Sequence, residues 1–266
     1  MPLKTDNAKP SDAPATTAAG REPVPLAHAA IHDVVAEIFD KLPRASGALL
    51  DVPAGEGALA ARLGALGFAV RCCDLYTEIF RLDGVEIRRG DLSGVLPYDD
   101  GEFAYLTCVE GLEHIENPAQ AIREFARVVR AGGHLVVTVP NILNIEERFK
   151  WLLNGYTSHF KPLSREHLQT LPRDFEGMEE IALHINPIPY TELRYTLEKY
   201  GFELLALHRD KPKAHLWAYR PVVALIRLLA RFTPERKRRE RWTDELQSDE
   251  ILLGGNTLIV HARKVP

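Results

Sequence analysis

The sequence has few cysteines, no long apolar run and no excess of positive charge. Its three cysteines, Cys72, Cys73 and Cys108, have the spacing of neither a disulfide framework nor a zinc site. No uninterrupted apolar stretch approaches the ~20 residues of a membrane span. The formal net charge is −4, which gives no general case for nucleic-acid binding. We therefore expect a cytoplasmic protein without a nucleic-acid partner.

The start of the chain lacks the apolar segment of a signal peptide. Residues 1–20 are rich in Ala, Pro, Thr and Lys, so we expect no signal peptide and a disordered tail over residues 1–22. The remaining residues, 23–266, form a segment long enough to bury the core of one large domain.

Short apolar strands alternate with helical patterns over most of that domain. Strands are expected at 48–52, 68–73, 85–88, 103–109, 134–139, 202–207 and 256–262. Helices are expected at 24–42, 57–66, 117–130 and 190–200, with Gly132 and Gly133 ending the third. This alternation predicts an α/β fold with a parallel sheet that binds ligands at the carboxyl ends of its strands.

A glycine loop follows the first expected strand. The run Asp51-Val52-Pro53-Ala54-Gly55-Glu56-Gly57 brings backbone close to a ligand, since glycine has no Cβ. With Ala60 it matches the dinucleotide fingerprint G-x-G-x-x-A, and Asp74 stands where a carboxylate would bind a ribose. One interpretation is therefore an NAD-type oxidoreductase. A tight turn without any ligand is a second one.

Two positions in the loop favour a different cofactor. Asp51 places a carboxylate at the site, which suits a ligand with an ammonium or sulfonium charge better than a pyrophosphate. Pro53 removes an N–H group that a phosphate would use. The loop thus fits a cationic cofactor without phosphates.

Further motifs follow in order along the chain: Gly90-Asp91-Leu92, Leu96-Pro97 with Gly101 and Phe103, and Glu110-x-x-Glu113-His114. With the loop and Asp74, they resemble class I S-adenosylmethionine-dependent methyltransferases, particularly the group that includes the ubiquinone-biosynthesis O-methyltransferases. The family usually has Gly where this chain has Pro53. The resemblance implies a Rossmann-like, seven-stranded, mostly parallel sheet with helices on both faces. Its last strand is expected to run antiparallel, between strands five and six.

The resemblance also implies which residues bind S-adenosylmethionine. Asp51, Gly55 and Gly57 would frame the methionine moiety, Asp74 the ribose, and Asp91 the adenine amino group. Leu75 and Leu92 would lie against the adenine ring. The full cofactor set is Asp51, Pro53, Gly55, Gly57, Asp74, Leu75, Asp91, Leu92 and Cys108. The alternative role of the three aspartates is to cap helices or stabilise turns.

Four residues are candidates for catalysis: Glu110, Glu113, His114 and His184. If Glu110 begins a helical turn, Glu113 and His114 share its face. The cluster also resembles the divalent-ion site of some small-RNA 2′-O-methyltransferases. Three roles stay open: a base or acceptor-orienting group, a metal site, and a purely structural hydrogen-bonded group. We assign no metal, and we expect His159 to be a surface or lid residue.

Two insertions interrupt the α/β pattern, at 141–185 and 211–250. The first is expected to be an acceptor lid, in which Phe149, Trp151, Tyr156 and Phe160 either wall the acceptor pocket or pack as core. The second contains an amphipathic helix at 216–232 with an arginine stripe at Arg220, Arg227 and Arg231, followed by a basic cluster and Trp242. Peripheral membrane contact through 216–242 at the inner face is one interpretation. A lid packed on the catalytic domain or a homodimer contact is the other.

The sequence therefore predicts a methyltransferase that uses S-adenosylmethionine. The expected acceptor is an oxygen of a small molecule, a glycan or a lipid-linked precursor. The alternatives are an NAD-type oxidoreductase and an adaptor that binds the cofactor without catalysis.

Overall fold

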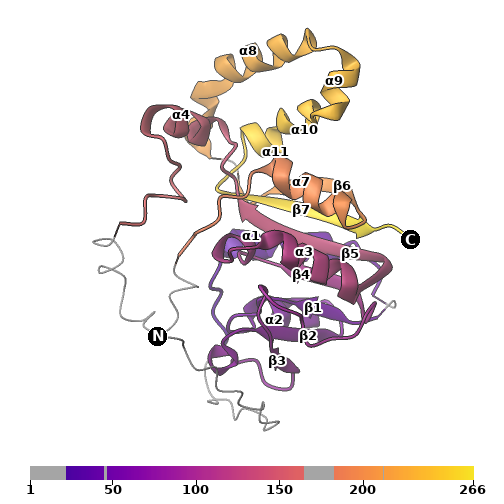
Figure 1. Ribbon diagram of the computed structural model, residues 1–266. Coiled ribbons are helices and arrows are strands. Elements are labelled where there is room, and N and C mark those ends of the chain that lie inside the picture. The colour runs from indigo at the N-terminus through magenta and orange to yellow at the C-terminus, as the bar shows by residue number, and fades with distance from the viewer. Residues whose placement is uncertain (1–21, 45–46, 165–182, 212) are drawn as a thin grey trace, which may run out of the picture.

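One seven-stranded sheet runs through the centre of the molecule (Figure 1). The computed structural model describes residues 22–44, 47–164, 183–211 and 213–266. The strands are β1 (Leu49–Asp51), β2 (Val70–Asp74), β3 (Ile87–Arg89), β4 (Phe103–Cys108), β5 (Val129–Pro140), β6 (Phe202–Arg209) and β7 (Thr257–Lys264). Their order is β3-β2-β1-β4-β5-β7-β6, and β7 is antiparallel to both of its neighbours. The predicted fold and the predicted place of the last strand are confirmed.

Helices cover both faces of the sheet. They are α1 (Ala29–Asp40), α2 (Ala58–Ala65), α3 (Pro118–Val128) and α7 (Tyr190–Lys199), with short 3-10 helices η1 (Thr77–Ile79) and η2 (Leu112–His114). Neighbouring side chains of a strand point to opposite faces. Leu49 accordingly packs in one core with α1 and α2, whereas Leu50 packs in the other with α3 and α7.

The third helix ends earlier than predicted. It stops at Val128, and β5 begins at Val129, so Gly132 and Gly133 lie within the strand rather than at a helix end. Phe103 of β4 pairs with Val129, but Tyr105 pairs with His134, so the extra residues of β5 bulge. A Cβ on Gly133 would lie 2.7 Å from Val129 Cγ1 and 2.9 Å from the Ala104 carbonyl oxygen. The glycines therefore permit a bulge and do not cap the helix.

The first helix also differs from its prediction, since α1 begins at Ala29 and not at Val24. The residue before a proline disfavours the helical conformation, and Pro25 follows Val24. The Val24 N–H instead donates to Glu56 Oε2 at 2.9 Å. This contact ties the segment ahead of α1 to the glycine loop.

The two insertions pack together in a separate small core. The first supplies α4 (Ile145–Asn154), and the second supplies η4 (Ala214–Tyr219), α8 (Arg220–Arg231), α9 (Glu235–Glu240), α10 (Thr243–Leu246) and α11 (Asp249–Leu252). Ile145, Leu216, Val223 and Leu252 form the centre of this core. The predicted helix over 216–232 is therefore two elements, with Pro221 in the first turn of α8.

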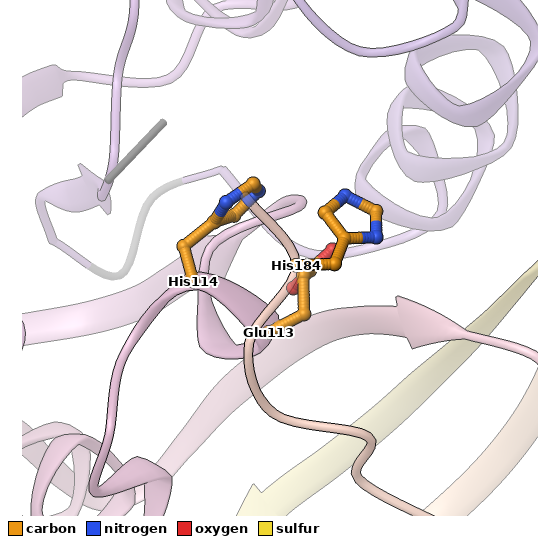
Figure 2. A group of neighbouring side chains, drawn as sticks. All are labelled: Glu113, His114 and His184. Atoms are coloured by element: carbon orange, nitrogen blue, oxygen red, sulfur yellow. The ribbon is translucent and has the colours of Figure 1, made fainter. Parts of the chain in front are cut away.

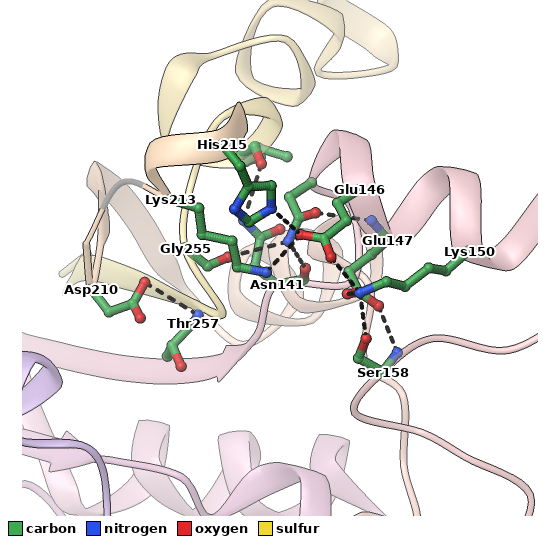
Figure 3. Close-up of polar contacts among 12 residues, drawn as sticks. Asn141, Glu146, Glu147, Lys150, Ser158, Asp210, Lys213, His215, Gly255 and Thr257 are labelled. Carbon is green, nitrogen blue, oxygen red and sulfur yellow. Dashed lines mark hydrogen bonds and ion pairs between the residues drawn. The ribbon is translucent and has the colours of Figure 1, made fainter. Parts of the chain in front are cut away.

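Polar contacts also join the two insertions (Figure 3). Glu146 Oε2 accepts from Lys213 Nζ at 3.0 Å and lies 3.1 Å from His215 Nε2. In Figure 1 these helices extend beyond the β6 and β7 side of the sheet.

The predicted tail, the predicted acceptor lid and the absence of a predicted membrane span can be compared with the described residues. The predicted tail over 1–22 lies outside the described residues except for Glu22. Residues 165–182 of the expected acceptor lid also lie outside them. None of the helices in the described ranges is both long enough and apolar enough to cross a membrane.

Gly57 offers a test of the loop geometry. Its φ is +94°, and an added Cβ would lie 2.8 Å from the Phe80 ring and 2.9 Å from Leu82 Cβ. We expect Gly57→Ala to lower the free energy of unfolding by about 1–3 kcal/mol. Gly64→Ala is the matched control, because Gly64 lies within α2 and its added Cβ has no neighbour within 4 Å. That variant should gain roughly 0.5–1 kcal/mol, and urea unfolding that gives both variants the same sign would contradict the assignment.

Candidate active site

A cavity of about 670 Å³ lies at the edge where the parallel strands end. This volume is within the usual range for small-molecule sites, roughly 300–1,000 Å³. Its walls include the loops after four neighbouring strands, at 51–56, 74–76, 90–93 and 109–111. The segment 24–28 ahead of α1 closes another side. The cavity thus stands where an α/β sheet is expected to bind ligands.

Asp74 holds three of these strand ends together. Its Oδ2 accepts from the Gly55 N–H at 2.8 Å, and its Oδ1 accepts from the Tyr76 N–H at 2.9 Å. Its backbone carbonyl accepts from the Gly90 N–H at 2.9 Å. Burial raises the pKa of this carboxyl, and the backbone donors oppose the rise. A carboxylate has more lone pairs than these two donors use, so Asp74 can also accept from a ligand.

Asp51 is a buried carboxyl group in the cavity wall. Neither of its oxygens has a hydrogen-bond partner of ordinary geometry among the described residues. Burial raises its pKa well above the usual range, the charge of Asp74 adds to the rise, and the nearby Ala60 N–H opposes it. A buried polar group without a partner is rare in folded proteins. A cationic ligand in the cavity would supply the missing partner.

The cavity as a whole is acidic. Seven acidic residues line it, and no arginine or lysine does so in the part of the chain that the structure describes. The seven are Asp51, Glu56, Asp74, Asp91, Glu110, Glu116 and Asp210. A pyrophosphate would have no basic side chain here, whereas an ammonium or sulfonium group would be stabilised. The electrostatics therefore favour S-adenosylmethionine over NAD.

Most predicted cofactor positions lie in the wall. They are Asp51, Pro53, Gly55, Asp74, Leu75, Asp91 and Leu92. Asp91 is exposed, and its Oδ1 also accepts from the Ser93 N–H at 2.7 Å. This hydrogen bond stabilises a turn, which is the alternative role that the sequence left open for Asp91.

Two predicted cofactor positions do not reach the cavity. Gly57 packs its backbone against Phe80 and Leu82 at the start of α2. Cys108 is fully buried, because β4 continues to this residue and its side chain points into the core. Its predicted place at the mouth is wrong.

Glu110 begins the acceptor side of the cavity. Its φ of +49° lies in the left-handed region. Its N–H donates to Thr138 Oγ1 at 2.8 Å, and that hydroxyl donates to Glu110 Oε1 at 3.2 Å. Burial raises the pKa of this carboxyl. The predicted helical turn is shorter than expected, since η2 spans only Leu112–His114.

The sequence predicted that Glu113 shares one face of a helical turn with Glu110. In the structure, Glu113 is not among the residues that line the cavity. It is fully buried, and neither oxygen has a hydrogen-bond partner of ordinary geometry within the described ranges. Burial raises its pKa well above the usual range, and the charge of Glu110 adds to the rise.

Histidine rings from three segments meet on this side. Figure 2 shows His114 on η2 and His184 on the segment before α7, with Glu113 between them and the sheet. The rings of His114 and His184 are nearly perpendicular, with centroids 4.8 Å apart. The ring of His159 stacks 6.3 Å from that of His184. His159 lines the cavity, which places this residue at the site rather than on the open surface.

The surroundings keep two of these rings neutral. Burial lowers the pKa of His184 to about 4, and His114 and His159 add to the effect. Burial also lowers the pKa of His159. Ligand atoms of Glu113, His114 and His184 lie within 4.8 Å of one another, so these residues are also the candidates for holding a divalent ion.

Of the four aromatic residues expected to wall an acceptor pocket, none lines the cavity. Phe149 packs on Tyr219 at 5.7 Å in the small core, and Trp151 and Tyr156 are exposed. Phe160 alone approaches the site, with its ring 5.6 Å from that of His184. The exposed pair points to a surface role.

Asp210, Asn256 and Thr257 line the cavity and were missed from the sequence. Asp210 follows β6, and its Oδ1 accepts from the Thr257 N–H at 3.4 Å. Because β7 is antiparallel, it begins at the edge where the other strands end. The sequence held a signal for Asp210, which is an acidic residue at the end of an expected strand. Asp51, Asp74 and Glu110 stand at the ends of their strands in the same way.

Comparison with known proteins agrees with this site. A family model described as "Methyltransferase domain" matches residues 26–207, more than half of the chain. The chain belongs to the class I S-adenosylmethionine-dependent methyltransferases. The acidic cavity of this methyltransferase has the position and the charge that S-adenosylmethionine needs, and the roles of Asp51, Gly55 and Asp74 in binding it stay predictions.

Two curated relatives and one solved structure illustrate the likeness. The chain is 33% identical over 110 residues to a ubiquinone biosynthesis O-methyltransferase of Xanthomonas oryzae, covering 38% of this chain and 46% of the relative. It therefore matches about half the length of that relative. It is 30% identical over 167 residues to the enzyme of that name from Shewanella pealeana, covering 56% of this chain and 71% of the relative. An S-adenosylmethionine-dependent methyltransferase structure from Archaeoglobus fulgidus shares the fold, with a TM-score of 0.54, 13% identity and coverage of 88% and 94%.

Replacing Asp74 tests the cofactor site. We expect Asp74→Ala to weaken S-adenosylhomocysteine binding about tenfold or more, because charge-assisted hydrogen bonds and the hold on Gly55 are both lost. Isothermal titration measures the change. Asp83→Ala, on an exposed loop outside the cavity, is the control. An unchanged dissociation constant for Asp74→Ala would refute the assignment.

Asp51→Asn separates stability from binding. The folded state raises the pKa of Asp51, so the stability that this carboxyl contributes is present at low pH and is lost as pH rises through the folded pKa. The variant should therefore gain stability over the original chain, on the order of 1 kcal/mol at neutral pH. The gain should shrink as pH falls toward about 5. Thermal unfolding across this range checks the sign, and S-adenosylhomocysteine affinity should fall despite the added stability.

Proposed function

We propose that this methyltransferase methylates an oxygen of a small-molecule, glycan or lipid-linked acceptor. The observation that carries the proposal is the group of histidines at one side of the cavity, where burial keeps His159 and His184 neutral. A hydroxyl acceptor must lose a proton during transfer, and neutral imidazoles are suited to take it. The curated relatives named above are O-methyltransferases, which is consistent with this chemistry.

The chain's own residues would orient the reactants and move one proton. When bound, S-adenosylmethionine supplies the methyl group, with its S–C bond breaking as the O–C bond forms and sulfur leaving as a neutral thioether. Asp51 and Asp74 hold the cationic cofactor, and the surrounding walls limit water at the reacting atoms. Because transfer removes the positive charge from sulfur, Asp51 beside the methionine moiety would bind the cofactor more strongly than the product.

His114 is the base that the geometry favours. Its Nδ1 lies 2.9 Å from the Leu183 carbonyl oxygen, and a carbonyl only accepts. Nδ1 therefore carries the proton of the neutral ring, and Nε2 is the nitrogen that can accept one. The acceptor hydroxyl would give its proton to this nitrogen, and the acidic cavity would stabilise the resulting imidazolium.

A His114→Ala variant tests the proposal. We expect the turnover number to fall about 10²–10⁴-fold, while S-adenosylhomocysteine affinity stays within about twofold, since the cofactor carboxylates are untouched. Release of S-adenosylhomocysteine with a cell extract as acceptor source is the readout. His215→Ala is the control, because that ring is mostly exposed and does not line the cavity. Equal loss of affinity and turnover would assign His114 a structural role.

The same assay distinguishes the remaining alternatives. Loss of turnover with a chelator, reversed by Mg²⁺ or Zn²⁺, would replace the base by a divalent ion held by Glu113, His114 and His184. Chelator-insensitive turnover favours the base. No release with any extract would favour a cofactor-binding adaptor.

A further inference from the structure

The described parts of the two insertions carry many of the exposed large apolar side chains of this protein. We name this set the insertion face. It comprises Trp151, Leu152, Leu153, Tyr156, Trp217, Leu225, Leu228, Leu229 and Phe232. The exposed fractions of Leu153, Trp217 and Phe232 are 78%, 71% and 78%. So many exposed large apolar side chains on two insertions that pack together favour an interaction site.

The exposure follows from the way α8 is packed. Val223 is buried in the small core, and Ile226 packs against that core. Positions 225, 228, 229 and 232 lie on the other side of the helix at 100° per residue. α8 is therefore apolar on two sides, and only one of them is used by the described parts of the fold.

Basic side chains border the apolar side. Arg220, Arg227 and Arg231 line one groove of about 520 Å³ beside Leu228, which confirms the predicted stripe. Residues 216–242 contain eight arginines and lysines but only two glutamates, in a chain with a net charge of −4. Arg227 is committed internally, because it donates to Asp249 Oδ1 at 2.6 Å and to the Gln247 carbonyl. Arg236, Arg238 and Arg239 also form ion pairs with acidic side chains on or near α9. Lys237 and Arg241 are exposed on and after α9.

We propose that the insertion face and the basic side chains of 216–242 dock on an anionic membrane surface. Leucine, tryptophan and phenylalanine enter the boundary between headgroups and acyl chains, while arginine and lysine pair with anionic headgroups. A second copy of this chain fits less well, because a two-fold contact would place the two basic segments against each other. A nucleic acid would match the charge but leave the leucines exposed.

The first insertion carries part of the insertion face and also reaches the cavity wall. Glu147 of α4 is buried and accepts from the Ser158 N–H at 2.7 Å, which fixes the loop that carries His159 to the cavity wall. The insertion face and the acceptor side thus belong to one packed unit. If the proposed function holds, this arrangement favours the lipid-linked acceptor. This step alone rests on the proposed function, whereas docking itself does not.

Vesicle co-sedimentation tests the docking. The full chain should bind vesicles of phosphatidylglycerol and phosphatidylcholine, and bind pure phosphatidylcholine at least about tenfold more weakly. Leu229→Gln/Phe232→Gln and Lys237→Glu/Arg241→Glu should each lower the partition coefficient about tenfold or more. Added salt should weaken binding of the original chain. Arg227 is left unchanged because its contacts hold α8 to the segment before α11.

Matched controls keep the result interpretable. Val95→Gln removes an exposed apolar side chain, and Arg89→Glu reverses an exposed charge, both away from the insertions. Both should bind vesicles like the original chain, and all variants should keep S-adenosylhomocysteine affinity, which shows that they fold. Absence of vesicle binding, equal binding by the face variants, or a dimer that the face variants dissociate in place of vesicle binding would overturn the proposal. Methyl transfer is not part of the readout, so failure here leaves the proposed function standing.

Discussion

The hydrogen bonds of Asp74 organise the cofactor end of the molecule. One side chain accepts from the loop after β1 and from its own loop after β2, while its carbonyl receives the first residue after β3. Three loops from separate parts of the chain are thereby held around one residue. These hydrogen bonds join three walls of the cofactor cavity. This also explains why capping and ligand binding, which looked like competing roles for Asp74, are compatible.

The carboxyl edge of a parallel sheet gathers whatever residues end its strands, and here these are acids. Asp51, Asp74, Glu110 and Asp210 come from four strand ends and share one cavity. Burial and the charge of Asp74 raise the pKa of Asp51, so ionising this carboxyl group in the cavity wall costs free energy. A cation bound beside Asp51 would lower that cost. The affinity for a cationic cofactor and the cost of burying Asp51 therefore have one origin.

The sequence predicted the strands and most of the helices because these depend on local patterns of apolar residues and glycines, whereas the place of the antiparallel last strand followed from the family resemblance. The cofactor residues stay predictions, and most of them lie in the cavity wall. The sequence misplaced Gly132, since the bulge depends on the register between β4 and β5. It also misplaced Cys108 and Glu113, because whether a side chain faces a cavity or the core depends on where each strand or turn stops. His159 could not be placed from pattern, as its position depends on the Glu147 contact with Ser158.

The packing of the two insertions connects the cavity to the insertion face. Asn141 at the end of β5 donates to the Ile251 carbonyl at 3.0 Å, and Asn144 donates to the Gly255 carbonyl at 3.2 Å. A Cβ on Gly255 would lie 1.8 Å from Asp210 Oδ1, so the turn before β7 must contain glycine to reach the cavity. Buried polar contacts of this kind fix one arrangement, because breaking any of them leaves an unsatisfied group. Packed and hydrogen-bonded contacts therefore join α8 to α4 and α11, and these two helices to the start of β7 beside the cavity.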